Sequence, residues 1–255
     1  MSLLRKSPGI AGSTGVGQIT SLGANVGNLS IKDQVLVVST GVWTDFVTVP
    51  VSSVIKIPEG LSVEDSAALP AALSAYAILN NFVTLKAGDV VVQYGGNTAV
   101  GQAITQIGTT SGYKIVNAGS AEISDVGFSK TVAAMGSVKL TITNTSKKAV
   151  SKTLMRCLAP KGSLVMYQGD GSNDDSDGVD VPVGSAIFKA NSIYGFNFNS
   201  WMVADPKGVA KAMAAVSPMV NSKKVTFQSK VFPQPEYLKA LGEMEATGGS
   251  VILKL

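Results

Sequence analysis

The chain has 255 residues, of which 45% are hydrophobic and only 15% are charged, so it can bury the core of one large or two modest domains without a disulfide or a metal. Its net charge of +4 comes from scattered basic residues, with the pairs Lys147–Lys148 and Lys223–Lys224 as the densest clusters, so we expect no dedicated nucleic-acid surface. Histidine is absent and Cys157 is the only cysteine, which excludes Ser-His-Asp and Cys-His catalysis, a disulfide framework and a zinc site.

The N-terminal region, residues 9–56, has the pattern of β structure. Val, Ile and Thr recur there between Gly and Asp, in the stretches GVGQITSLG, DQVLVVST and DFVTVPVSSVIKIP. Residues 62–82 then predict a helix, with Ser62 as its cap and Glu64 and Asp65 in its first turn. The sequence contains no run of about 18 or more apolar residues, so we expect no transmembrane segment.

From Asp89 onward, strands alternate with helices. The apolar stretch DVVVQY is typical of a strand buried on both faces. Further strands are predicted over residues 114–119, 138–144 and 162–168, and helices over residues 99–112, 147–160 and 206–220, before a tail of strand character that ends in SVILKL. This alternation indicates βαβ units and therefore a parallel sheet.

The turn GGNTAVG, residues 95–101, joins the strand DVVVQY to the next helix. Such a turn can bind phosphate, because the backbone N–H groups of a helix N-terminus are unpaired and the helix dipole favours negative charge. Gly101 is expected to allow close helix–strand packing, whereas the methyl group of Ala99 adds bulk where a pyrophosphate would pass. The candidate cofactor contacts in the turn are Asn97, Thr98, Ala99, Val100 and Gly101.

The segment LKAGDVVVQYGGNTAVGQAITQIG resembles the entry to the cofactor domain of the zinc-free medium-chain dehydrogenases/reductases. Its turn is most similar to the Asn-Ser-Gly-Val-Gly turn of mitochondrial trans-2-enoyl-CoA/ACP reductases. Further segments agree in order, among them GSTGVGQITSLGANVGNLSIKDQVL, LAPKGSLVMYQG and IFKANSIYGFNFNSW. The resemblance implies an α/β fold with a Rossmann-like domain over residues 84–225, a truncated β-rich (GroES-like) catalytic-domain remnant over residues 1–83 and 226–255, and a mitochondrial location.

Enzymes of that family transfer hydride from NADPH with the help of a tyrosine that precedes the segment resembling residues 12–18. This chain starts only a few residues before that segment, so we assign no catalytic residue and expect an N-terminally truncated, degenerate relative. By the same resemblance, Ser120 and Glu122 replace arginines that hold the 2′-phosphate. Glu122 would repel a phosphate, or it could bind a ribose hydroxyl and favour NAD.

Tyr167, Gly169 and Phe196 lie in segments that keep the family pattern, and we treat them as vestigial cofactor contacts. Because aromatic side chains commonly fill cores, Tyr167 and Phe196 could instead be packing residues.

Three hypotheses about function are compatible with this sequence. We expect a non-catalytic, enoyl-reductase-like protein without a cofactor, acting as a structural or assembly subunit of a larger mitochondrial complex. The low fraction of charged residues supports this hypothesis, because a surface covered by partner proteins needs fewer charges. The alternative is an active 2-enoyl-thioester or quinone reductase that uses NADPH or NADH. The third hypothesis is a nucleotide sensor that forms a homodimer through the Rossmann edge strand within residues 187–196.

Overall fold

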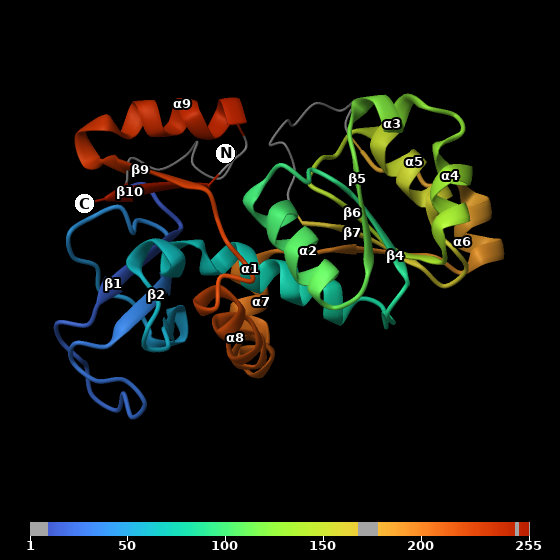
Figure 1. Ribbon diagram of the computed structural model, residues 1–255. Helices are drawn as coiled ribbons and strands as arrows, with labels where there is room; N and C mark the ends of the chain where they lie inside the picture. The colour runs from blue at the N-terminus through green and yellow to red at the C-terminus, as the bar shows by residue number, and fades with distance from the viewer. Residues whose placement is uncertain (1–9, 168–177, 248–249, 255) are drawn as a thin grey trace. The chain divides into compact units, whose positions relative to one another are not determined.

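The computed structural model describes residues 10–167, 178–247 and 250–254, which fall into two compact units (Figure 1). One, the parallel-sheet unit, comprises Ser74–Asn197. The other, the split unit, joins the chain up to Leu73 to the chain from Phe198 onward. The domain limits expected from the sequence, after residues 83 and 225, stay a prediction, because compactness alone does not define them.

Among its described residues, the parallel-sheet unit contains five strands in the order β5-β4-β6-β7-β8, and each neighbouring pair is parallel. The strands are β4 (Val90–Tyr94), β5 (Lys114–Ala118), β6 (Val138–Thr143), β7 (Ser163–Met166) and β8 (Ser192–Gly195). The expected α/β class with a Rossmann-like parallel sheet is therefore confirmed. Val90, Val91 and Val92 are completely buried, because helices cover both faces of the sheet.

Five helices of this unit follow the strands or lie between them: α2 (Ala99–Thr110), α3 (Ser120–Ser124), α4 (Phe128–Met135), α5 (Lys148–Cys157) and α6 (Val183–Lys189). Helices α4 and α5 pack against each other, and α2 packs beside β5. Buried Val132, Leu154 and Leu164 join the strand valines in one hydrophobic core, and Cys157 at the end of α5 belongs to the same cluster. The helices α3, α4 and α6 were not predicted from the sequence.

Helix α1 (Val63–Asn81) begins where the sequence predicts. The hydroxyl oxygen of Ser62 accepts a hydrogen bond from the backbone N–H of Asp65 at 3.0 Å, which satisfies an otherwise unpaired donor in the first turn. The Asp65 carboxylate forms an ion pair with Lys223 at 2.7 Å. The capping role of Ser62 is therefore confirmed.

The described part of the split unit has two small sheets. The antiparallel sheet consists of β1 (Thr14–Gln18), β2 (Gln34–Val38) and β3 (Val54–Lys56), and Val35, Val37 and Val42 form its core with Leu29. The parallel pair consists of β9 (Ser229–Pro233) and β10 (Ser250–Lys254). Helices α7 (Phe198–Ala204), α8 (Pro206–Asn221) and α9 (Tyr237–Thr247), with the 3-10 turns η2 (Val51–Ser53) and η3 (Gln234–Glu236), complete the unit.

The tail of the chain differs from expectation. The final strand is present as β10, but α9 lies between β9 and β10 and makes them a parallel strand–helix–strand unit. Within the described residues, none of the helices combines the length and the apolar character that crossing a membrane requires.

Candidate functional site

The topology of the parallel sheet places a candidate ligand site at the ends of β4 and β6. The strand that follows β4 in sequence, β5, pairs on one side of it, and β6 pairs on the other side. In open α/β sheets, ligands bind outside the carboxyl ends of the strands where the strand order reverses in this way. Tyr94 and Thr143 are register partners at the ends of β4 and β6, so the residues after them line this position, which we call the switch-point site (Figure 1).

Two glycines follow β4, and side chains of this same chain occupy the space beside both of them. Gly95 has a φ of +100°, in the left-handed region that favours glycine, and a Cβ there would collide with Asn144 Oδ1. A Cβ on Gly96 would lie 2.6 Å from Asn117 Oδ1. In dinucleotide-binding turns, glycine leaves room for a pyrophosphate. Here two amide side chains fill the space where these glycines lack a side chain.

Gly101 has the packing role expected of it. It lies in the first turn of α2, and a Cβ there would collide with the carbonyl oxygen of Gly95. Its missing side chain therefore lets the helix pack directly on the turn. The packing role predicted for Gly101 is confirmed.

Thr98 is the N-cap of α2, and its hydroxyl group connects three parts of the site. Its oxygen accepts the Gly101 N–H at 3.1 Å, and its O–H donates to the Gly95 carbonyl at 2.8 Å. The Tyr167 hydroxyl lies 2.8 Å from the same oxygen. Because the single proton of Thr98 goes to Gly95, Tyr167 must be the donor in this last hydrogen bond.

Tyr167 directly follows β7, and its backbone N–H donates to the Thr143 carbonyl at 3.1 Å. Burial raises the pKa of its hydroxyl, and the hydrogen bond with Thr98 opposes that increase. The group is therefore neutral at physiological pH, and its proton is already engaged. Tyr167 thus connects the end of β7 to the start of α2 across the switch-point site.

A buried amide beneath the turn was not recognised in the sequence. Gln93 of β4 is 1% exposed, and its Nε2 lies 2.9 Å from the Gly101 carbonyl, 2.9 Å from Thr105 Oγ1 and 2.7 Å from Asn117 Oδ1. This network fixes the amide of Asn117 beside Gly96. The signal in the sequence was the amide residue Gln93 directly after the three valines of the strand VVVQY.

The end of β5 carries negative charge. Glu122 lies in the first turn of α3, and its Oε2 accepts the backbone N–H of Gly119 at 2.8 Å. The backbone N–H groups of Glu122 itself and of Gly119 lower the pKa of this carboxyl group, so it is ionised at neutral pH. In dinucleotide-binding folds this position faces the ribose. An ionised carboxylate here disfavours a 2′-phosphate.

The remaining predicted contacts lie in different surroundings. Asn97 is exposed, and its carbonyl accepts the side-chain N–H of Gln102 at 2.9 Å, while Ala99 and Val100 form the first turn of α2. Phe196 is 7% exposed and packs edge-on against Phe82, with ring centroids 6.2 Å apart. Gly169 lies outside the described residues.

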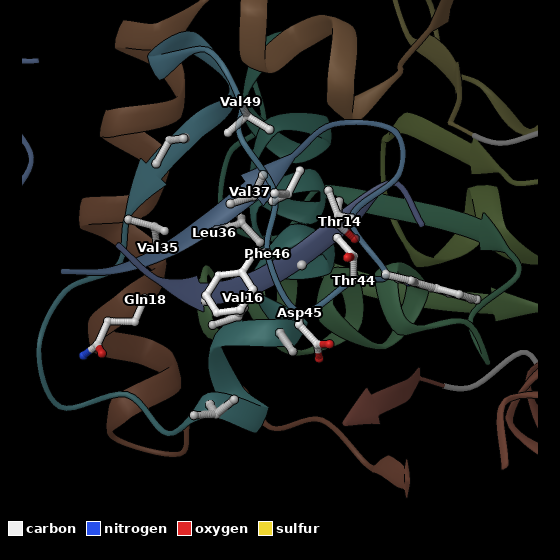
Figure 2. A pocket seen from close by; sticks show the side chains of 18 of the residues that line it. Thr14, Val16, Gln18, Val35, Leu36, Val37, Thr44, Asp45, Phe46 and Val49 are labelled. Atoms are coloured by element: carbon white, nitrogen blue, oxygen red, sulfur yellow. The ribbon is translucent and has the colours of Figure 1, made fainter. Parts of the chain in front are cut away.

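The structure also contains a cavity of about 830 Å³ (Figure 2), and it is not at the switch-point site. All residues that line it belong to the split unit. Among the described residues, no cluster of three or more His, Cys, Asp or Glu side chains is placed to hold a metal ion.

The chain is similar in sequence to mitochondrial enoyl-[acyl-carrier-protein] reductases. It is 29% identical to the one from Caenorhabditis elegans over 215 residues, covering 76% of this chain and 61% of the relative. It is 27% identical to the one from Arabidopsis thaliana over 267 residues, covering 93% of this chain and 70% of the relative. The chain thus spans between three fifths and seven tenths of these relatives. No protein-family model matches the sequence.

Solved structures share the fold. The Etr1p complex with NADP and crotonyl-CoA superimposes with a TM-score of 0.79 at 19% identity, covering 97% of this chain and 80% of that one. The mitochondrial 2-enoyl thioester reductase Etr1p/Etr2p heterodimer from Candida tropicalis gives a TM-score of 0.77 at 19% identity with the same coverage.

Proposed function

Because the chain belongs to the zinc-free branch of the medium-chain dehydrogenase/reductase superfamily, we propose that it is an enoyl thioester reductase-like protein without catalytic activity. In this proposal it is a structural or assembly subunit of a larger mitochondrial complex. It binds no cofactor, and its Rossmann-like and β-rich parts, over residues 84–225 and over residues 1–83 and 226–255, serve as a scaffold.

The observation that carries the proposal is the close packing of the protein's own side chains on the turn after β4. Asn144 and Asn117 fill the space beside the two glycines, and Tyr167 connects to Thr98 across the site. Ala99 also stands where such a turn has its close-approach glycine, and its methyl group adds bulk where a pyrophosphate would pass. A turn packed in this way suits a scaffold better than an enzyme.

The charge at the end of β5 supports the same conclusion. NADPH carries a 2′-phosphate, which proteins hold with arginine because its guanidinium group forms paired, charge-assisted hydrogen bonds. The residues after β5 instead read GSAEISD, with two acids and no base. The site therefore does not fit NADPH.

A titration with NADPH and, separately, with NADH tests the proposal, followed by nucleotide fluorescence and by calorimetry. We expect no binding of either nucleotide up to about millimolar concentration, which corresponds to about −4 kcal/mol. Binding near micromolar, or about −8 kcal/mol, would overturn the non-catalytic proposal.

The second candidate is an active NAD(P)H-dependent 2-enoyl-thioester or quinone reductase. The capped N-terminus of α2 at the switch point favours it, since such a helix start attracts phosphate. A related fold has been solved with NADP and crotonyl-CoA, which makes that thioester the substrate to assay. If this candidate is correct and Glu122 binds the ribose, Glu122→Gln will weaken NADH binding about tenfold or more and leave NADPH binding unreduced.

We propose two possible kinds of protein partner. The preferred one is a set of other proteins that assemble with this chain into a larger complex. The mitochondrial location in this proposal is carried over from the named relatives. The other is a homodimer through β8, which pairs with β7 alone among the described strands and forms one edge of the sheet. A determination of mass in solution separates them, because a homodimer forms from the purified chain and an assembly subunit needs other proteins.

A further inference from the structure

Positive charge gathers at the amino-terminal edge of the parallel sheet. Because neighbouring strands of this sheet are parallel, their first residues lie along one edge. Each described strand has a lysine within four residues of its first residue, and Arg156 lies in the last turn of α5, beside them. These six cations, which we call the basic edge, are Lys86, Lys114, Lys139, Arg156, Lys161 and Lys189.

Hydrogen bonds hold four residues of the basic edge close together. The backbone N–H of Lys161 donates to the Lys189 carbonyl at 2.7 Å, and Lys189 Nζ donates to the Arg156 carbonyl at 3.4 Å. Lys139 Nζ donates at 3.4 Å to the carbonyl of Pro160, the residue before Lys161. These four cations therefore form one cluster where the starts of β6, β7 and β8 meet the ends of α5 and α6.

Part of this charge has a structural use, but an excess remains. Lys114 Nζ donates to the carbonyl of Met135, the last residue of α4, at 2.6 Å. The end of a helix carries only about half a negative charge, so a full positive charge there is not neutralised. Among the described residues, no hydrogen bond or ion pair holds the side chains of the remaining three, Lys86, Arg156 and Lys161.

Little negative charge opposes the basic edge. Asp89 is the only carboxylate in the described part of this unit that directly precedes a strand. Glu122 and Asp125 follow the opposite, carboxyl end of β5, and Asp180 pairs with Lys152 at 3.1 Å. The basic edge is therefore a surface that attracts anions.

Exposed apolar side chains of α6 adjoin the basic edge. Val183, Ile187 and Phe188 are 68%, 67% and 86% exposed, and Phe188 directly precedes Lys189. Val183 and Ile187 are four residues apart, so they lie on the same side of the helix. Apolar side chains beside lysine and arginine are typical of protein surfaces that lie in the headgroup region of a membrane.

A lipid surface accounts for both features of this face. It offers phosphate to the cations and hydrocarbon to the apolar side chains. A nucleic acid would supply phosphate but no hydrocarbon for Val183 and Ile187. In a symmetric pair of chains joined through this face, the two basic edges would repel each other.

We propose that the basic edge and the exposed side of α6 bind the surface of an anionic phospholipid membrane. The cations lie at the level of the lipid phosphates, and Ile187 and Phe188 enter the boundary between headgroups and acyl chains. The net charge of +4 adds attraction of the same sign at longer range. This binding goes beyond the proposed function and does not depend on whether the chain binds a nucleotide.

Co-sedimentation of the purified chain with vesicles tests the proposal. One set of vesicles is phosphatidylcholine, and in the other about a third of the lipid is the anionic phosphatidylglycerol. We expect binding to the anionic vesicles to be at least about tenfold tighter. Raising the salt concentration from about 0.1 M to about 1 M should remove that difference, because the Debye length falls from about 10 Å to about 3 Å.

Two double variants separate the basic edge from the overall charge. Arg156→Gln with Lys161→Gln removes two cations of the basic edge. Lys147→Gln with Lys148→Gln removes two exposed cations at the other end of α5, so both variants have the same net charge. We expect the first variant to bind anionic vesicles at least about tenfold more weakly and the second to lose less than about threefold.

A matched pair of phenylalanine variants tests the apolar contribution. Phe188→Ala removes the exposed ring beside the basic edge, and Phe46→Ala removes a ring of the split unit that is 78% exposed. We expect Phe188→Ala to weaken vesicle binding about fivefold or more and Phe46→Ala to leave it unchanged. Phe188→Trp should bind as well as the natural chain, because tryptophan also favours the membrane interface.

Equal binding to the two kinds of vesicle would overturn the inference, as would equal losses in the two double variants. A dimer in solution that Phe188→Ala dissociates would show that a second copy covers α6, and would overturn it as well. Binding of single-stranded RNA that fails in the Arg156 and Lys161 variant, without vesicle binding, would assign this face to a nucleic acid instead.

Discussion

At the scale of single residues, the switch-point site depends on a hydroxyl group whose hydrogen bonds are fully accounted for. The Thr98 hydroxyl donates a hydrogen bond to the Gly95 carbonyl, so the Tyr167 hydroxyl is the donor toward Thr98. Tyr167 therefore helps to hold the turn and α2 in place.

We expect Tyr167→Phe to lower the free energy of unfolding by about 1 kcal/mol, because it removes one partly buried hydrogen bond and keeps the ring. Tyr94→Phe is the matched control, since the Tyr94 hydroxyl lies 3.5 Å from Ser120 Oγ and is weakly bonded. Urea denaturation measures both variants. A loss no larger than that of Tyr94→Phe would show that the contact with Thr98 contributes nothing.

Gly95→Ala separates backbone strain from the clash with Asn144. Gly88 also has a positive φ, +89°, but a Cβ there would meet nothing within 4 Å. We expect Gly88→Ala to cost about 1 kcal/mol from strain alone and Gly95→Ala to cost about 2 kcal/mol more, with Asn144→Ala recovering part of that difference. Equal losses in chemical denaturation of the two single variants would mean that Asn144 does not fill the space beside Gly95.

Cys157 makes stability depend on pH in the alkaline range. Burial raises the pKa of its thiol from 9.0 to about 11, while Lys189 acts in the opposite direction. The neutral thiol therefore contributes stability that is complete below pH 9 and is lost as pH rises toward about 11. This contribution amounts to about 2–3 kcal/mol. Denaturation curves of the natural chain and of Cys157→Val should diverge over that interval, and parallel curves would contradict the prediction.

At the scale of helices and strands, the sequence predicts best the elements with a clear local signal. The apolar run of β4 and the Ser62 cap of α1 were both located correctly. Helix α9 was missed because its stretch YLKALGEMEAT lies between two strand-like segments and has no recognised cap. Helix α6 was missed because its sequence, VGSAIFK, leaves three large apolar residues exposed, so no amphipathic pattern marks it.

Ser62 offers a test at this scale. Ser62→Ala removes the acceptor for the Asp65 N–H and a hydroxyl that also donates to the Asp65 carboxylate at 2.8 Å. We expect a loss of about 1 kcal/mol in unfolding free energy. Exposed Ser52, in the short turn η2, provides the control as Ser52→Ala, which should change stability by less than about 0.5 kcal/mol. Indistinguishable denaturation midpoints would rule out the capping contribution.

At the scale of the whole molecule, the superfamily and the parallel sheet could be predicted because ordered motifs and βαβ alternation extend along most of the chain. The packing of two amide side chains against the glycines of the switch-point site could not be predicted. Asn144 and Asn117 lie far from Gly95 and Gly96 in sequence, and only the parallel register of β4, β5 and β6 brings them together. The cavity in the split unit could not be predicted from the sequence either, since it depends on how two sheets pack.

The two units should unfold separately when the chain is alone. The parallel-sheet unit has a continuous buried core, whereas the split unit contains the cavity. Both tryptophans, Trp43 and Trp201, lie in the split unit, so their fluorescence reports on that unit alone. We expect the fluorescence change to precede the final loss of helical circular dichroism as urea increases, and coincident transitions would contradict this.

The buried thiol has a practical consequence for spectroscopy. Cys157 is 4% exposed and its pKa is raised, so almost no reactive thiolate is present at neutral pH. Toward maleimide dyes the native chain should therefore behave as if it had no cysteine. A cysteine introduced at an exposed position, such as Phe46, would then take up a single fluorophore, so that the signal of the labelled chain comes from one known site.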